Sequence, residues 1–183
     1  SFLTLAVTEV TERASIPWLT LSYADSVTSR GFKYLVATSA TSSRIARETM
    51  PTYVSLVEQA TGARPKTIAM VADSQPATQA YVEELRKGGL ESLGIKAVVD
   101  ETFTPVISDA TGMIQRVRRA RPDFMLLYTS NVPDTKLIIE KMDEFGIGGG
   151  KIPVLAPGSQ VGAPEMLDNI VKESLEGMVC TAS

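Results

Sequence analysis

The stretch TIAMVADSQPATQAYVEELRKGGLESLGIKAVVDETF, residues 67–103, decides the fold. Its first seven residues are nearly all apolar or small, and they predict a buried strand that ends at Asp73. A polar turn follows, then a run with helical spacing from about Ala77 to Leu93, then a second apolar run at 95–103. Strand, helix and strand in this order form the right-handed unit from which parallel sheets are built.

The same alternation continues along the rest of the chain. Further strands are predicted at 16–22, 32–38, 123–130, 151–158 and 177–183, and helices at 3–14, about 43–60, 108–120, 131 to about 145, and about 163–171. The strands are apolar throughout rather than alternating, so both faces of the sheet should be covered. The pattern predicts an α/β fold with a doubly wound, mostly parallel sheet.

Three local expectations accompany this fold. Pro51 lies inside the helix 43–60 and is expected to kink or restart it, because proline lacks the backbone N–H that a helix interior uses. Ser108 is expected to cap the helix that follows it. The polar segment 24–31 is expected to be a loop.

Composition excludes several classes of function. The net charge of −3 argues against a nucleic-acid partner, which requires a clustered basic surface. The chain has no histidine and one cysteine, which removes the usual general base, a disulfide and most zinc sites. No apolar run reaches the roughly 18 residues of a membrane span. The chain opens without Met in an already periodic pattern, which indicates a processed product or an excised piece.

Candidate ligand groups lie in the turns that follow the strands, because parallel sheets bind ligands at their carboxyl ends. The turns carry Ser22 and Tyr23, Ser74 and Gln75, Ser130 and Asn131, and Ser159 and Gln160. In three of them a hydroxyl lies beside a carboxamide, and such groups donate and accept hydrogen bonds without titrating near neutral pH. They suit a small polar ligand. The alternative for any single residue is helix capping, although glutamine is not a preferred cap.

The candidate enzyme motifs in the chain do not match the patterns that their chemistry requires. GIGGGK at 146–151 lacks the spacing of a phosphate loop and follows a helix, and PGSQVG at 157–162 is not a nucleophile elbow. Asp100 and Glu101 are neighbours within a strand and should point to opposite faces of the sheet. Asp73 is a better turn initiator than partner for a ligand ammonium. We therefore expect no catalytic residue, no metal site and no cofactor.

The order of these elements resembles a known family. The runs at 12–54, 66–103, 119–147, 154–167 and 176–183 are similar to the type I periplasmic solute-binding proteins of ABC importers. Within that group the chain resembles the branched-chain amino-acid (leucine/isoleucine/valine) receptors. The resemblance covers nearly the whole chain, and its strength lies in the order and spacing of motifs that are individually soft.

The resemblance implies two α/β lobes that close on a ligand. Residues 1–40 would be the end of the first lobe, 41–177 the second lobe, and 178–183 a strand returning toward the hinge. The chain would then be a fragment centred on the second lobe. The expected partners are a small-molecule ligand and an ABC permease, with no nucleic acid and no direct membrane insertion. The expected location is periplasmic, or extracytoplasmic with a lipid anchor, with the signal peptide outside this chain.

By position, the resemblance places ligand contacts on the turns already singled out, and adds Ala77 and Gly158. Ala77 stands where amino-acid receptors often have an aromatic residue, and Gly158 with Ser159 where they often have an acid for the ligand ammonium. These departures widen the expected ligand from a branched-chain amino acid to an aromatic or aliphatic carboxylate or an amide. The alternative function is a ligand-sensing domain of a regulator with the same fold. An enzyme would need a titrating group in the crevice.

Overall fold

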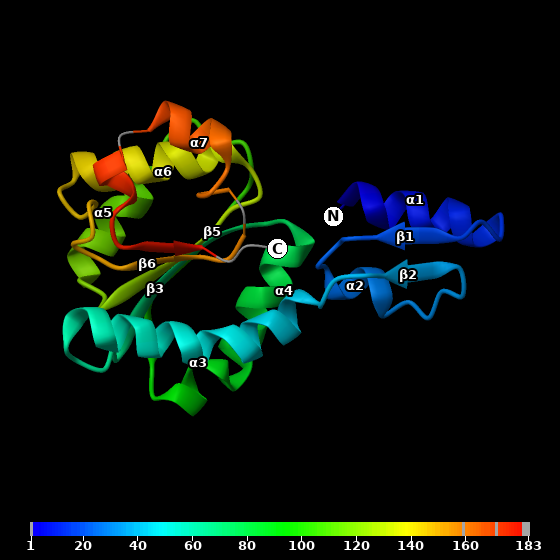
Figure 1. Ribbon diagram of the computed structural model, residues 1–183, viewed down its shortest axis with the longest axis horizontal. Helices are drawn as coiled ribbons and strands as arrows, with labels where there is room; N and C mark the ends of the chain where they lie inside the picture. Colours follow the sequence, from blue (N-terminus) through cyan, green and yellow to red (C-terminus); the bar gives the residue numbers. More distant parts are fainter. Residues whose placement is uncertain (1, 159, 171, 181–183) are drawn as a thin grey trace.

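The computed structural model describes residues 2–158, 160–170 and 172–180, which form two units with separate sheets (Figure 1). The first unit, here called the arm, holds a two-stranded parallel sheet and two helices. Its elements are α1 (Phe2–Arg13), β1 (Trp18–Thr20), α2 (Asp25–Thr28) and β2 (Leu35–Ala37).

The second unit, here called the body, holds a five-stranded sheet in the order β4-β3-β5-β6-β7, and every neighbouring pair is parallel. Its elements are α3 (Ser42–Thr61), β3 (Thr67–Asp73), α4 (Pro76–Glu84), β4 (Lys96–Phe103), α5 (Thr111–Ala120), β5 (Phe124–Tyr128), α6 (Val132–Glu144), β6 (Val154–Ala156), α7 (Pro164–Asn169) and β7 (Met178–Cys180). The predicted α/β class and the parallel sheet are confirmed.

Two hydrophobic cores cover the two faces of the body sheet. Alternate residues of β3 point to opposite faces, with Ile68 and Met70 in one core and Ala69 and Val71 in the other. Helices α3 and α4 close the first core, and α5 and α6 close the second (Figure 1). Because both faces are buried, the strands read as continuous apolar runs.

The carboxyl ends of the body strands lie on the side of the arm (Figure 1). Register fixes this alignment, since Ala72 pairs with Tyr128 and Leu126 with Leu155. The arm meets the body there, through contacts between α2 and α4. The turns that follow the strands are therefore brought to one edge, next to the arm.

Two expectations about helix continuity need correction: the restart at Pro51 and the C-terminal end of the helix after β3. Pro51 does not restart its helix, because α3 runs unbroken from Ser42 to Thr61. The residue lies on the exposed face of α3, where water can serve the carbonyl that proline leaves without a partner. The helix predicted from Ala77 to Leu93 ends at Glu84 instead. It passes into a π-helical turn at Leu85–Gly89, where Gly88 has φ 121°, and then a 3-10 turn at Glu91–Leu93.

Two smaller expectations also need correction. The segment 24–31 is not all loop, because it contains the short helix α2. Ser108 does not cap α5. The Oδ1 of Asp109 accepts hydrogen bonds from the backbone N and Oγ1 of Thr111, at 3.0 and 2.6 Å, and thereby serves the first turn of that helix.

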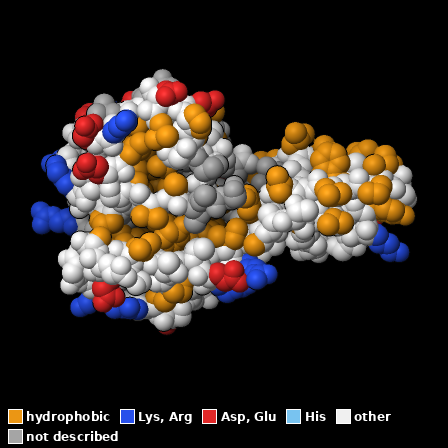
Figure 2. Space-filling model, in the orientation of Figure 1, with side chains coloured by type: hydrophobic (Ala, Val, Ile, Leu, Met, Phe, Trp, Pro, Cys, Tyr) orange, Lys and Arg blue, Asp and Glu red, His pale blue; other side chains and the backbone are white. Residues whose placement is uncertain are grey.

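The arm leaves much of its apolar surface uncovered (Figure 2). The exposed large side chains are Phe2, Leu3, Val10, Ile16, Leu19, Leu21, Tyr34 and Val36. Leu3 is 77% exposed and Val10 66%, so the apolar stripe of the first helix does not face a core here. A two-stranded parallel sheet has too few residues to bury both of its faces.

None of the helices in the described ranges combines the length and the apolar character needed to cross a membrane.

Candidate functional site

Asp73 joins two of the predicted ligand turns. It is the last residue of β3, and it is fully buried. Its Oδ1 accepts a hydrogen bond from the backbone N of Gln75 at 3.0 Å, and its Oδ2 accepts one from the backbone N of Ser130 at 2.6 Å. Its carbonyl oxygen accepts from Nε2 of Gln79 at 2.6 Å. The carboxylate thus fixes the turn after β3 against the turn after β5.

The turn after β3 presents uncharged groups. The backbone N of Ser74 donates to the carbonyl of Phe103 at 2.8 Å, which ties this turn to the end of β4. Gln75 occupies the N-cap position of α4, but its side chain makes no capping hydrogen bond. Ala77 lies in the first turn of that helix and is half-buried. The carboxamide of Gln75 is therefore not committed to its own helix.

The two predicted residues in the turn after β5 have different roles in the structure. Ser130 is exposed, and its Oγ lies 3.5 Å from Oγ1 of Thr78 on α4. Asn131 caps α6, because its Oδ1 accepts from the backbone N of Asp134 at 2.8 Å and its Nδ2 donates to Oδ2 of Asp134 at 2.7 Å. The other oxygen of Asp134 accepts from the backbone N of Ile107 at 3.0 Å. These bonds use one N–H and one oxygen lone pair of the Asn131 amide, so its second N–H and second lone pair remain for a ligand.

The turn after β6 is shaped by Gly158 and Gln160, while Ser159 lies outside the described residues. Gly158 has φ +139°, a conformation that side-chain-bearing residues rarely adopt. A Cβ at this position would lie 2.5 Å from Oε1 of Gln160 and 3.8 Å from Cε2 of Tyr128. The neutral carboxamide of Gln160 thus fills the space in which a side chain at 158 would project.

Tyr128, the last residue of β5, lies beside the turn after β6 although no prediction placed it in the site. Its ring packs edge-on against Tyr81, with centroids 5.3 Å apart, and it borders Gly158 at the end of β5. Burial raises the pKa of the Tyr128 hydroxyl, so the group stays protonated. An aromatic residue ending a strand, rather than lying inside one, is the signal that could have identified it.

The turn after β1 brings Ser22 and Tyr23 to the junction of arm and body. The backbone N of Ser22 donates to Oγ1 of Thr20 at 3.0 Å, and its Oγ accepts from the backbone N of Ala24 at 3.4 Å. The carbonyl of Tyr23 accepts from the backbone N of Ser42, at the start of α3, at 2.7 Å. The turn is therefore attached to the body, next to the strand ends.

The predicted site residues that the structure describes thus lie on turns at one edge, with Ala77 in the first turn of α4, and both oxygens of each acid that they contact already accept hydrogen bonds. Asp73 and Asp134 are buried, and each uses both carboxylate oxygens for hydrogen bonds within the protein. The side-chain groups that remain available to a ligand at these turns are hydroxyls and carboxamides. Among the described residues no three acidic, histidine or cysteine side chains gather as a metal site would require.

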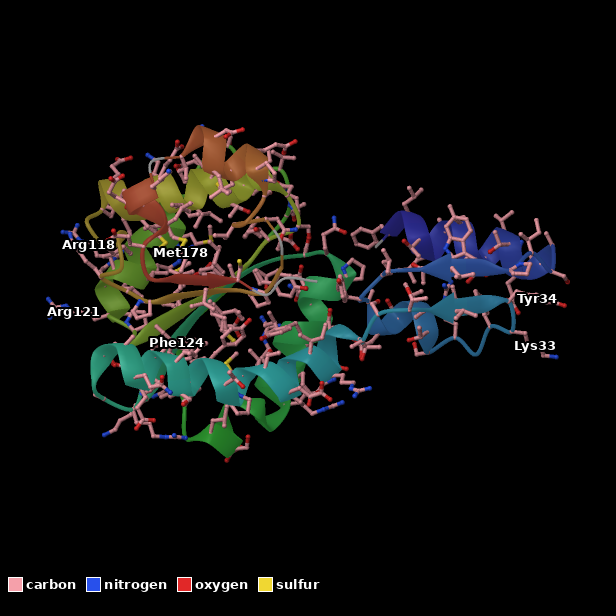
Figure 3. The ribbon with its side chains drawn as sticks, in the orientation of Figure 1. Lys33, Tyr34, Arg118, Arg121, Phe124 and Met178 are labelled. Atoms are coloured by element: carbon pink, nitrogen blue, oxygen red, sulfur yellow. The ribbon has the colours of Figure 1, made fainter. Side chains whose placement is uncertain are left out.

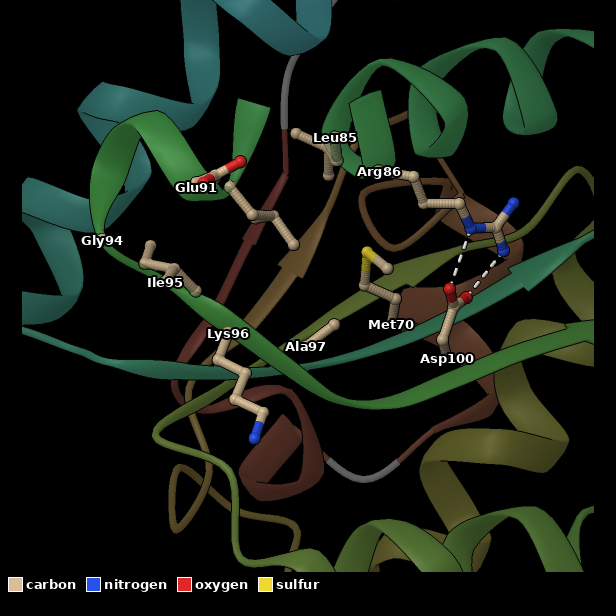
Figure 4. Close-up of a pocket in the computed structure, with 10 residues that line it drawn as sticks. Met70, Leu85, Arg86, Glu91, Gly94, Ile95, Lys96, Ala97 and Asp100 are labelled. Atoms are coloured by element: carbon tan, nitrogen blue, oxygen red, sulfur yellow. Dashed lines mark hydrogen bonds and ion pairs between the residues drawn. The ribbon is translucent and has the colours of Figure 1, made fainter. Parts of the chain in front are cut away.

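A separate pocket of about 530 Å³ lies away from these turns, against the edge strand β4 (Figure 4). Met70, Leu85 and Ala97 line it. Arg86 closes one side through Nε and Nη2, which donate to the two carboxylate oxygens of Asp100 at 2.8 and 2.6 Å. On the other face of β4, Glu101 pairs with Arg116, so the two adjacent acids do point apart as predicted.

Comparison with known proteins identifies a family whose match covers the whole chain. A family described as periplasmic binding protein matches residues 1–183. A Leu/Ile/Val-binding protein homolog from Brucella abortus is 23% identical over 176 residues, which cover 91% of this chain and 43% of the Brucella protein. The chain thus spans less than half the length of this curated relative.

Two solved structures share the fold. An ABC transporter solute-binding protein from R. palustris, in complex with 4-hydroxybenzoate, is similar with a TM-score of 0.72 and 20% identity, over 90% of this chain and 44% of its own. A branched-chain amino-acid ABC transporter protein from Thermus thermophilus, with bound valine, gives a TM-score of 0.75 and 17% identity, over 97% of this chain and 43% of its own. The chain belongs to the periplasmic binding protein family.

Proposed function

We propose that this chain is part of the solute-binding component of an ABC importer. It would bind a small ligand between two lobes, outside the cytoplasm, and deliver it to a membrane permease. Residues 1–40 would be the end of the first lobe, 41–177 the second lobe, and 178–183 the return toward the hinge. The observation that carries the proposal is the convergence of uncharged hydrogen-bonding turns at the carboxyl edge of a parallel sheet, in a chain of this family.

The proposed ligand contacts are Ser22, Tyr23, Ser74, Gln75, Ala77, Ser130, Asn131, Ser159 and Gln160. Closure of the lobes on the ligand would be a population shift, in which the ligand stabilises the closed form because it contacts both lobes there. The closed form would then be the one that the permease recognises. No step in this cycle needs a catalytic group or a cofactor.

We propose a carboxylic acid or an amide as the ligand, rather than a free amino acid. A buried ammonium needs a counter-charge, and the turns of the body offer none that is not already bonded within the protein. Hydroxyls and carboxamides can hold carboxylate and carbonyl oxygens. The R. palustris relative with 4-hydroxybenzoate supports this choice, and the Thermus relative with valine supports the branched-chain alternative.

The test is a thermal-shift screen of the full-length protein. The panel contains leucine, isoleucine, valine, aromatic carboxylates, aliphatic mono- and dicarboxylates and primary amides. A ligand at a hundredfold excess over its Kd stabilises the fold by about 2.7 kcal/mol, which is a readily measured shift. Shifts with carboxylates but not with amino acids support the proposal. Shifts confined to amino acids would mean that the other half of the site supplies an acid.

A further inference from the structure

The helix α3 begins with a cap that its own segment does not provide. Thr41 occupies the N-cap position with extended backbone angles, but its side chain makes no capping hydrogen bond. The Oδ2 of Asp25 instead accepts from the backbone N of Ser43 at 3.2 Å, and the Oδ1 of Asp25 accepts from Oγ of Ser43. A carboxylate at this position accepts from an N–H that has no partner within the helix, and it also lies at the positive end of the helix dipole.

This cap crosses from the arm to the body. Asp25 is the first residue of α2 in the arm, whereas Ser43 lies in the first turn of α3 in the body. The chain between the two units is the segment 38–41. Next to the cap, the carbonyl of Tyr23 accepts from the backbone N of Ser42 at 2.7 Å. The proposed ligand turn of the arm is therefore two residues from the group that anchors it.

We infer that Asp25 is a positioning residue that latches the Ser22–Tyr23 turn onto α3. The inference rests on the proposed function, because it assigns Asp25 the role of setting the arrangement of the ligand turns of the two lobes. The bonds to Asp25 are charge-assisted, and they act on a short connection about which the lobes would turn. Without the carboxylate, Thr41 has the chemistry to cap α3 locally, so the helix survives while the side-chain link between the units is lost and the backbone bond from Ser42 to Tyr23 remains.

The test measures the arrangement directly in the full-length protein. Spin labels are attached through Lys33→Cys on the arm and Arg118→Cys on the body, two exposed positions at opposite ends of the molecule (Figure 3). The exposed Cys180 is replaced by serine. Pulsed electron–electron double resonance then gives the distribution of distances between the labels, without any ligand.

Asp25→Ala should broaden this distribution or add a second distance. The ratio of latched to unlatched molecules should fall roughly fivefold, the effect of losing one typical N-cap. The matched control is Asp109→Ala, which removes the same kind of cap, over Thr111, within the body alone. It should leave the distribution unchanged. Ser43→Ala removes only the hydroxyl half of the latch and should give an intermediate result.

A distribution that stays as narrow in Asp25→Ala as in the parent protein overturns the inference. So does equal broadening by Asp109→Ala, since the effect would then be general loosening. If Asp25→Ala does not fold, as judged by circular dichroism, Ser43→Ala decides: unchanged distances refute the latch and broadened ones support it. The measurement needs no ligand, so failure of the ligand screen leaves this result separate.

Discussion

Replacing Asp73 with alanine should destabilise the fold and disorder the proposed ligand turns together. The substitution removes two charge-assisted hydrogen bonds, from the backbone N of Gln75 and the backbone N of Ser130. Such bonds contribute about 1.5–3 kcal/mol each, which gives about 3–6 kcal/mol for the pair. Ser130 is exposed, so water can serve its N–H and the lower end applies. We expect a loss of about 3 kcal/mol in the free energy of unfolding.

The assay is urea unfolding of the full-length protein followed by circular dichroism. With a slope of about 2 kcal/mol per molar urea, the midpoint should fall by about 1.5 M. The affinity for whichever panel ligand stabilises the parent protein should fall as well, because two of its turns lose their common anchor. Calorimetric titration of that ligand measures this second effect.

Asp123 provides a matched control at the opposite end of the same sheet. Its Oδ2 accepts from the backbone N of Lys66 at 2.8 Å and from the backbone N of Thr67 at 2.9 Å, and the residue is exposed. Asp123→Ala should cost about 1 kcal/mol and leave ligand affinity unchanged. A loss below 1 kcal/mol for Asp73→Ala would refute its anchoring role. Equal affinity losses in the two variants would refute the location of the site.

Three further substitutions test separate features. Pro51→Ala should stabilise the protein by about 1–3 kcal/mol in thermal unfolding, because it restores a helix-interior N–H, and no gain would mean that the helix already compensates. Gly158→Ala should cost about 1–3 kcal/mol and weaken ligand binding, because of the positive φ and the approach of a Cβ to Gln160, and unchanged affinity would remove this turn from the site. The pKa of Asp123 is lowered mainly by the hydrogen bond from the backbone N of Lys66. Asp123→Asn should therefore reduce the free energy of unfolding at pH values above about 4, which is the pKa of an aspartate carboxyl in the unfolded chain. The difference in stability should vanish as the pH falls through the lower pKa that Asp123 has in the folded protein. A loss of stability that persists at about pH 2 would contradict the role of the ionised carboxylate.

The strands were predictable because their residues carry the signal locally. A strand buried on both faces is apolar along its central residues, and the run IAMVA at 68–72 shows this without reference to its neighbours. The strand bounds from Thr67 to Asp73 came directly from the sequence. The direction of the sheet followed from the helices between strands, since a parallel pair needs a crossover. The turns at the carboxyl edge followed from that direction.

The hydrogen-bond partners of the turns were not predictable. Asp73 and Ser130 are 57 residues apart, and only the folded sheet brings them together. The cap of α3 could have come from any serine or threonine at 39–43, yet it comes from Asp25 in another unit. Asn131 has the same composition signal as Gln75, but its amide caps a helix and that of Gln75 does not. Composition alone cannot separate these two uses.

The exposed apolar surface of the arm has a consequence for the association of this polypeptide in solution. The body completes two cores of its own, so residues 42–180 contain most of what is needed to fold. The arm offers two open strand edges and a surface of leucine, valine and phenylalanine, which is the composition that drives neighbouring molecules to associate. Produced as these 183 residues alone, the protein should form oligomers joined arm to arm, and a shortened version that begins at residue 41 should remain monomeric.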